Sequence, residues 1–125
     1  MNTWWLVAGL ATAAVWAVHT FVGQGTVARP LTAAGDLGAV PKWTQFYCWH
    51  LVTITLAVMA LGFGYAAFAP TAADVAATVT ALAIAFGLFG LVLPGRVGQS
   101  FATMPQGPLL LPIGLLGLIG MFARG

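Results

Sequence analysis

Charged side chains are almost absent from this chain. Only four basic and two acidic residues occur among 125, and 61% of the residues are apolar, whereas a soluble domain carries about a quarter charged residues. This composition excludes an ordinary water-soluble fold. Four scattered cations cannot form a clustered basic face, so nucleic acid is also excluded as a partner.

Cysteine and the familiar catalytic sets are equally scarce. Cys48 is the only cysteine, so an internal disulfide and the CxxC patterns of zinc or redox sites are absent. The chain has no Ser/His/Asp set, no phosphate-binding GxxxxGK[ST] motif and no HExxH motif. Asp36 and Asp74 are expected on opposite membrane faces and cannot act as a carboxylate pair. We therefore expect a protein that is not an enzyme.

Apolar sequence is abundant and recurs in runs of about 20 residues, the length of helix that crosses a hydrocarbon layer of about 30 Å. We predict a single all-α membrane domain over residues 1–125, a four-transmembrane-helix antiparallel bundle. The expected helices are 4–22, 45–68, 75–93 and 108–122. The last is short for a membrane span.

Glycines, prolines and polar residues predict the ends of these helices. Gly23-Gln24-Gly25 is expected to end the first, and Gln24–Trp43, with two prolines and three charged residues, is expected to form the longest loop. The short connection 70–74 predicts that the second and third helices are antiparallel neighbours. Pro94-Gly95-Arg96 is expected to stop the third helix.

The basic residues predict an orientation. Arg29 and Lys42 in the first loop and Arg96 in the third share one side, against Arg124 alone near the other end of the chain. By the positive-inside rule, loops one and three are expected in the cytoplasm and both termini outside. The expected location is a bacterial inner membrane.

Small residues line each predicted helix and indicate how the helices pack, since close approach in lipid depends on them. Packing inside the bundle is the first interpretation. The alternative is that Gly114, Gly117 and Gly120 on the last helix contact another subunit.

His19 and His50 are the only histidines, and ionisable residues in membrane spans are costly enough to indicate function. Both are expected at matched depth on facing helices near the cytoplasmic side. Neutral imidazoles there could ligate haem, share a transition metal or relay protons. A structural role, with each histidine bonded to a carbonyl or headgroup water, is the other interpretation.

Polar residues gather on the same side and form a candidate binding face, composed of Gln24, Arg29, Arg96 and Gln106. Such a face could hold an anionic headgroup or a quinone head. The same pattern is also typical of ordinary cytoplasmic loops.

Three short motifs carry a resemblance. His19-x-x-x-Gly23, Trp49-His50 and Pro105-Gln106 resemble those of a group of small, uncharacterised four-helix bacterial inner-membrane proteins. The resemblance spans most of the chain, with Gln24 standing where a Gly or Glu is expected. It implies the fold and an inner-membrane location, and it implies that the two histidines belong together.

The leading functional hypothesis is a non-enzymatic accessory or structural subunit that packs against a larger membrane complex or forms a homo-oligomer. The first alternative is a haem, metal or quinone-head binding protein that uses His19 and His50. The second is a small oligomeric channel lined by small and polar residues.

Overall fold

The computed structural model describes residues 1–69 and 71–123, which form helices joined by short connections. The helices are, in order, an unbroken first helix Thr3–Ala33, α3 (Ala39–Phe68), α4 (Ala73–Arg96) and α5 (Gln106–Phe122). No strand occurs in these two described stretches. The predicted all-α fold with four helices is confirmed.

Three of the four helices are long and apolar enough to cross a membrane, namely Thr3–Ala33, α3 and α4. The fourth, α5, has 17 residues and is shorter than the others. It begins two residues before the predicted start at 108 and ends at the predicted residue. Its predicted shortness is therefore confirmed.

The first helix continues well beyond its predicted end at Val22. Its parts are α1 (Thr3–Ala17), the π-helical segments η1 (Val18–Val22) and η2 (Gln24–Ala28), and α2 (Arg29–Ala33). A π-helical ladder carries the chain through the glycines, with the amide of Gly23 donating to the carbonyl of Val18. Pro30 lies at the start of α2, but the helix is continuous with η2, so its missing amide removes one hydrogen bond from the helix.

The predicted long loop is therefore wrong, because only residues 34–38 separate the first helix from α3. Pro41 does not prevent an early start of α3, since it lies in the first turn of that helix. Lys42 Nζ donates to the carbonyl oxygen of Thr32 at 3.4 Å and so satisfies an acceptor at the end of α2.

The third predicted helix, 75–93, corresponds to α4, which is longer than predicted at both ends. Pro94 lies within α4, which continues to Arg96. Its fixed φ is compatible with a helix, and near the helix end its main cost is one lost amide donor, the one that would have bonded to Gly90. In the predicted connection 70–74, Pro70 lies outside the described residues.

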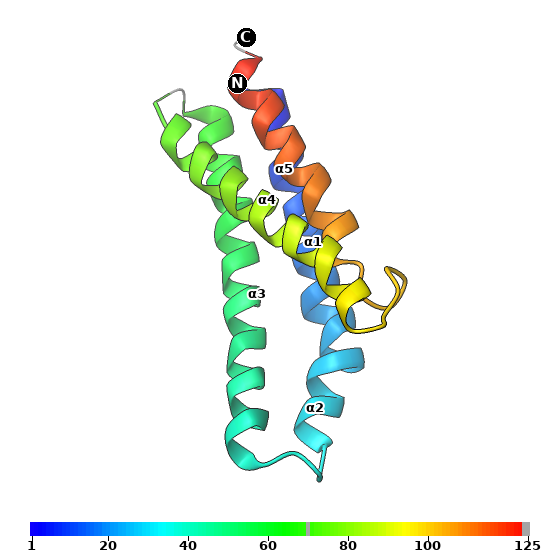
Figure 1. Cartoon of the computed structure of the whole chain (residues 1–125). Helices are drawn as coiled ribbons and strands as arrows, with labels where there is room; N and C mark the ends of the chain where they lie inside the picture. Colours follow the sequence, from blue (N-terminus) through cyan, green and yellow to red (C-terminus); the bar gives the residue numbers. More distant parts are fainter. Residues whose placement is uncertain (70, 124–125) are drawn as a thin grey trace.

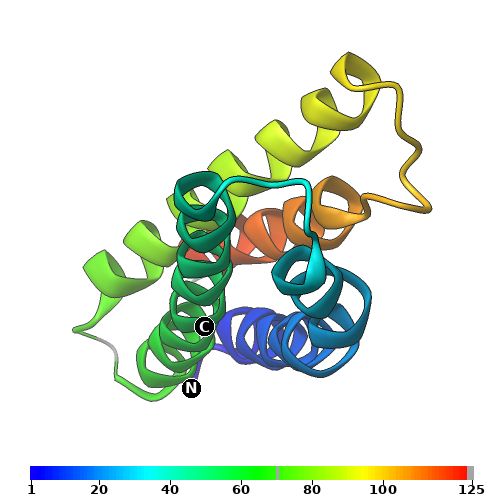
Figure 2. The same ribbon diagram turned by 90° about the horizontal axis from the view of Figure 1, so that it is seen from below.

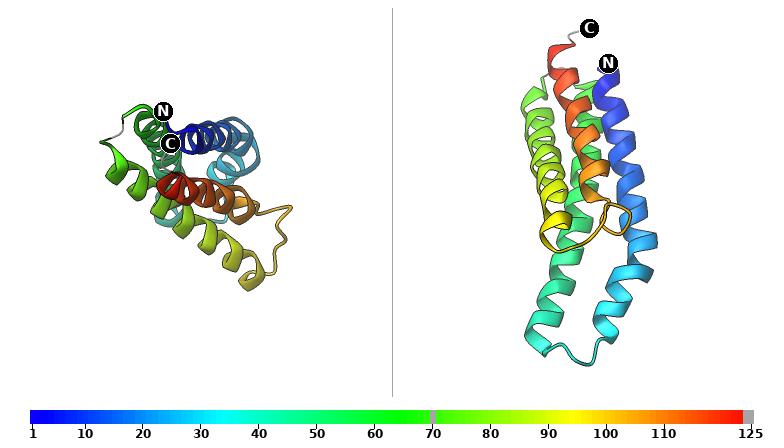
Figure 3. Two further views of the ribbon diagram at one scale, coloured as in Figure 1. Left: turned by 90° about the horizontal axis from the view of Figure 1, so that it is seen from above. Right: turned by 45° about the vertical axis from the view of Figure 1, so that its right-hand side comes forward.

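The two pairs of helices differ in length (Figure 1). The first helix and α3 form a long hairpin, and α4 and α5 pack along only part of it (Figure 3). The most extensive contacts join α4 to α5 and α1 to α3. We call residues 18–50, which include the connection 34–38, the free end of the hairpin, because α4 and α5 lie along the other part of it (Figure 3). We call residues 2–12, 56–69, 72–90 and 107–123 the closed end, because the four helices pack together there.

The closed end contains most of the buried core. Met59 and Phe63 of α3 are fully buried there, together with Ala83 of α4 and Ile113 of α5. Seen from below, α5 lies between α4 and the first helix (Figure 2). All four helices therefore contribute to packing at this end.

Asn2 joins three helices at the closed end. Its side-chain oxygen accepts from the amides of Trp4 and Trp5 at 3.1 and 3.2 Å, which caps α1. Its Nδ2 donates to the carbonyl of Gly120 at 2.7 Å, and its backbone amide donates to that of Ala67 at 2.8 Å. One residue thus fixes α1 to α3 and α5.

Glycines bring the helices of the closed end together. Gly114 packs against Ile84, Gly117 against Thr80 and Gly120 against Trp5. All three glycines are buried inside the bundle, so the alternative that this stripe contacts another subunit is wrong, and packing within the bundle is confirmed. The indole of Trp5 also donates to the carbonyl of Gly117 at 3.1 Å.

Candidate functional site

His19, in η1, packs against Trp49 of α3 near the middle of the hairpin. The two ring centroids are 3.9 Å apart and the ring planes make an angle of 18°. His19 Nε2 lies 3.3 Å from the carbonyl oxygen of Trp49. Because a carbonyl can only accept a hydrogen bond, Nε2 carries the proton and the lone pair remains on Nδ1.

Gly23 makes room for the same tryptophan. A Cβ atom at Gly23 would lie 2.6 Å from Cη2 of Trp49. The indole therefore lies across one face of the first helix, between His19 and the glycine four residues later. The His19-x-x-x-Gly23 motif and the first residue of the Trp49-His50 motif are thus one contact between two helices.

His50 lies at the same height, but its ring has a different neighbour. It meets Phe46 edge to face, with centroids 4.6 Å apart and planes at 81°, and it is exposed. Consecutive residues point about 100° apart around a helix, so when Trp49 faces His19, His50 faces elsewhere. The described contact of His19 is with Trp49 and not with the second histidine.

The helix around His19 has a rare conformation. Two successive π-helical segments, η1 and η2, carry residues 18–28 with hydrogen bonds to the fifth preceding residue. π-Helical turns are uncommon and frequently occur at functional sites. The two π-helical segments therefore indicate that the region around His19 is a candidate functional site.

Metal ligation by a larger cluster has no support in this region. No group of three or more His, Cys, Asp or Glu side chains is close enough to hold an ion among residues 1–69 and 71–123. Cys48 is exposed. A group that needs two axial ligands would have His19 and His50 as its only histidine donors.

The four residues of the predicted polar face lie in two separate places. Gln24 and Arg29 belong to the first helix and not to a loop, whereas Arg96 ends α4 and Gln106 begins α5. Figures 1 and 2 both place α2 away from the end of α4. Arg29 and Arg96 are exposed, but they do not form a single face.

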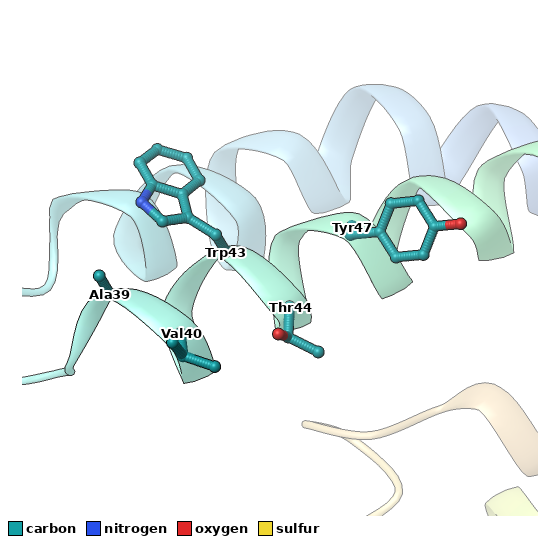
Figure 4. Close-up of a pocket in the computed structure, with 5 residues that line it drawn as sticks. All are labelled: Ala39, Val40, Trp43, Thr44 and Tyr47. Carbon is teal, nitrogen blue, oxygen red and sulfur yellow. The ribbon is translucent and has the colours of Figure 1, made fainter.

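A shallow groove follows one side of α3 at the free end (Figure 4). We call the residues that line it the α3 stripe: Ala39, Val40, Trp43, Thr44 and Tyr47. The exposed fractions are 78% for Val40, 56% for Trp43 and 63% for Tyr47. The stripe therefore offers a continuous surface with two accessible aromatic rings.

Sequence reasoning missed two residues beside His19. Trp16 Nε1 and Thr20 Oγ1 are buried and have no hydrogen-bond partner among the described residues. Both are polar side chains in an apolar segment, four residues apart, and they flank the histidine along the sequence. That spacing was the available signal, since it places them on one side of a helix.

Comparisons of the chain with family models, with curated proteins and with solved structures found no match. The resemblance carried by the three short motifs therefore stays a prediction.

Proposed function

We propose that this chain is an integral membrane protein whose four helices cross the bilayer as an antiparallel bundle, and that it acts as a non-enzymatic accessory subunit of a larger membrane complex. Three apolar helices of membrane-spanning length support the first part. The 17 residues of α5 extend about 26 Å, slightly less than the hydrocarbon thickness of about 30 Å. Small local thinning of the bilayer accommodates such a mismatch.

The connection between α4 and α5 locates one membrane boundary. Residues 97–105 are non-helical and include Gln99, Ser100 and Thr103, and irregular polar backbone is not stable against lipid. The boundary therefore runs at the height of this connection. The first helix, with 31 residues, and α3, with 30, extend about 45 Å, so the free end projects about 15 Å beyond the hydrocarbon.

The observation that carries the docking role is the exposed α3 stripe on this projecting end. Apolar and aromatic side chains that face lipid need no explanation, but the stripe lies beyond the hydrocarbon. Trp and Tyr favour the headgroup layer as well as protein interfaces, so the docking role depends most on Val40, which projects further and is 78% exposed. We propose that the stripe receives a helix or loop of the partner subunit.

The charges favour one orientation in a bacterial inner membrane. Arg29, Lys42 and Arg96 lie toward the projecting side, which the positive-inside rule assigns to the cytoplasm. In a Cys48→Ser background, a cysteine at Asp36 is expected to react with a membrane-impermeant maleimide only after the cells are opened. Labelling in intact spheroplasts would show that the protein has the opposite orientation.

Photo-crosslinking from single positions tests the docking role. A photoreactive residue at Val40 or Tyr47 is expected to join the chain to one and the same polypeptide, identified by mass spectrometry. The matched control is Leu61, an equally exposed position on α3 within the proposed span, which is expected to give lipid adducts. A protein that stays monomeric after mild extraction, with no crosslink from either stripe position, would refute the role.

A second candidate, a histidine-dependent cofactor binder, is supported by the Nδ1 lone pair of His19 and by the exposure of His50 at the same height. Haem would give the gently extracted protein a Soret band, and a transition metal would appear in stoichiometric amount by elemental analysis. Either signal should vanish in His50→Ala. A colourless, metal-free protein would remove haem and metal from consideration.

A further inference from the structure

Trp16 and Thr20 present two buried polar atoms without a partner on one side of the first helix. Trp16 is next to the last residue of α1 and Thr20 lies in η1. Their Nε1 and Oγ1 atoms are inaccessible to solvent and bond to no described residue. Residues four apart are neighbours on a helix surface, so both atoms belong to the same turn as the contact between His19 and Trp49.

Thr20 differs from the threonines that satisfy their hydroxyl locally, a property that it shares with Thr80. Five others donate their hydroxyl to the carbonyl four residues earlier, at 2.7–3.2 Å, the usual local solution for a helical threonine. They are Thr12, Thr26, Thr53, Thr55 and Thr78. Thr26 does so within η2, so π-helical geometry does not forbid this bond. The Thr20 hydroxyl is instead left for another acceptor.

An indole N–H can only donate, and a hydroxyl can donate as well as accept. A buried donor without an acceptor lowers stability, and water cannot replace the missing bond because both atoms are inaccessible to solvent. Two such donors on one turn are therefore best explained by an acceptor that both share. Burying an anionic oxygen without a paired cation is costly, so an uncharged oxygen is the favoured acceptor.

We propose that Trp16 Nε1 and Thr20 Oγ1 bind the carbonyl oxygen of a lipophilic molecule. The inference rests on the membrane placement proposed above and on neither of the two proposed functions. Trp5 packs against Gly120, and α5 begins 14 residues before Gly120, at Gln106, so the first-helix residues about 14 positions after Trp5 lie near the height of the α4–α5 connection. In the proposed placement, residues 16–20 therefore lie near the hydrocarbon boundary, within reach of phospholipid ester carbonyls and of a quinone head. The oxygen enters when the side chains that now cover the two atoms move aside.

Thermal unfolding of the full chain in lipid nanodiscs tests the proposal. Thr20→Val removes the hydroxyl and keeps the shape, and Trp16→Phe removes the indole N–H. Each is expected to lower the midpoint by about 4 °C, whereas Thr20→Ser keeps the hydroxyl and should stay close to the wild type. Thr80→Val is the matched control, because Thr80 Oγ1 is also buried and unpaired but lies alone against Gly117; its midpoint should not fall.

The choice of lipid and added quinone distinguishes the two sources of the carbonyl. If the acceptor is a lipid ester, diether phospholipids, which lack the carbonyl, lower the wild-type midpoint, and Thr20→Val abolishes the difference. If it is a quinone, added ubiquinone or menaquinone raises the wild-type midpoint in either lipid but not that of Thr20→Val.

Three outcomes would overturn the proposal. In the first, Thr20→Val and Trp16→Phe match Thr80→Val, with unchanged or higher midpoints. In the second, both variants lose the same stability in every lipid, with or without quinone, which would indicate lost packing. In the third, Thr20→Val does not fold and wild-type stability is the same in diester and diether lipids and with quinone. None of these results would affect crosslinking from the α3 stripe, so failure here is distinguishable from failure of the docking role.

Discussion

The closed end and the free end of the hairpin are built from the same kind of sequence but held in different ways. At the closed end, glycines let backbones touch and Asn2 joins three helices. At the free end, two helices meet chiefly through side chains, with the Trp49 ring between His19 and Gly23. Backbone contact leaves no room for an added atom, whereas a side chain can shift to accommodate one.

The largest expected effect comes from closing the narrowest backbone contact. A Cβ at Gly90 would lie 2.5 Å from the backbone nitrogen of Gly107, so Gly90→Ala must separate α4 from α5 and is expected to cost about 3 kcal/mol. The matched change at the free end is Gly25→Ala, where nothing lies within 4 Å; it should be neutral or stabilising. Unfolding in mixed detergent micelles measures the free energy of unfolding of both variants. An equal loss of stability in the two would contradict the proposed difference between the closed end and the free end.

Asn2→Ala is expected to have the next largest effect, a loss of about 2 kcal/mol, because it removes a helix cap and a hydrogen bond between helices. Asn2→Asp keeps the capping oxygen but loses the donor to Gly120, so its stability should fall between those of the wild type and the alanine variant. Unfolding midpoints for the three proteins check this order. A harmless alanine variant would show that the closed end does not depend on this residue.

Gly23→Ala is expected to cost less than the closed-end glycine change, about 1 kcal/mol, because the ring tip of Trp49 can move aside where a backbone cannot. The same change made in a Trp49→Leu background should cost nearly nothing, and the double-mutant cycle gives the coupling between the two positions. Tryptophan emission reports the displaced ring. Equal costs in both backgrounds would contradict the proposed fit.

The smallest effect on stability is expected at the α3 stripe. Trp43→Ala removes an exposed ring and should change the free energy of unfolding by less than about 0.5 kcal/mol. The same substitution is expected to reduce crosslinking from Tyr47 several-fold. Lost stability with unchanged crosslinking would show that the ring supports the fold and does not receive a partner.

The sequence was sufficient to predict the number and type of helices, because long apolar runs leave few alternatives. It failed at their ends. Gly23 and Gly25 have poor helix propensity, yet the helix continues through them, and packing of Trp49 against Gly23 supports it there. Pro94 lies within its helix and not after it. At Gly23 tertiary packing outweighs the low helix propensity of glycine, and at Pro94 only one backbone hydrogen bond is lost in the last turn.

The site was only partly predictable. The matched height of His19 and His50 followed from helix spacing, but the stacking of His19 on Trp49 did not, since sequence does not fix the rotation of one helix against another. The free hydroxyl of Thr20 was likewise hidden, because a helical threonine ordinarily bonds to its own backbone. Arg29 and Arg96 were predicted to lie in loops that form one face. Arg29 instead lies within the longer first helix, away from Arg96 at the end of α4.

The bonds of Asn2 and Trp5 to Gly120 and Gly117 join positions 118 and 112 residues apart. These bonds can form only after the last helix has been synthesised; in the proposed membrane placement, the first helix would enter the bilayer before that. In that interval the indole N–H of Trp5 lacks its acceptor on α5. We expect nascent chains stalled before α5 to be the form most readily captured by insertases and membrane proteases.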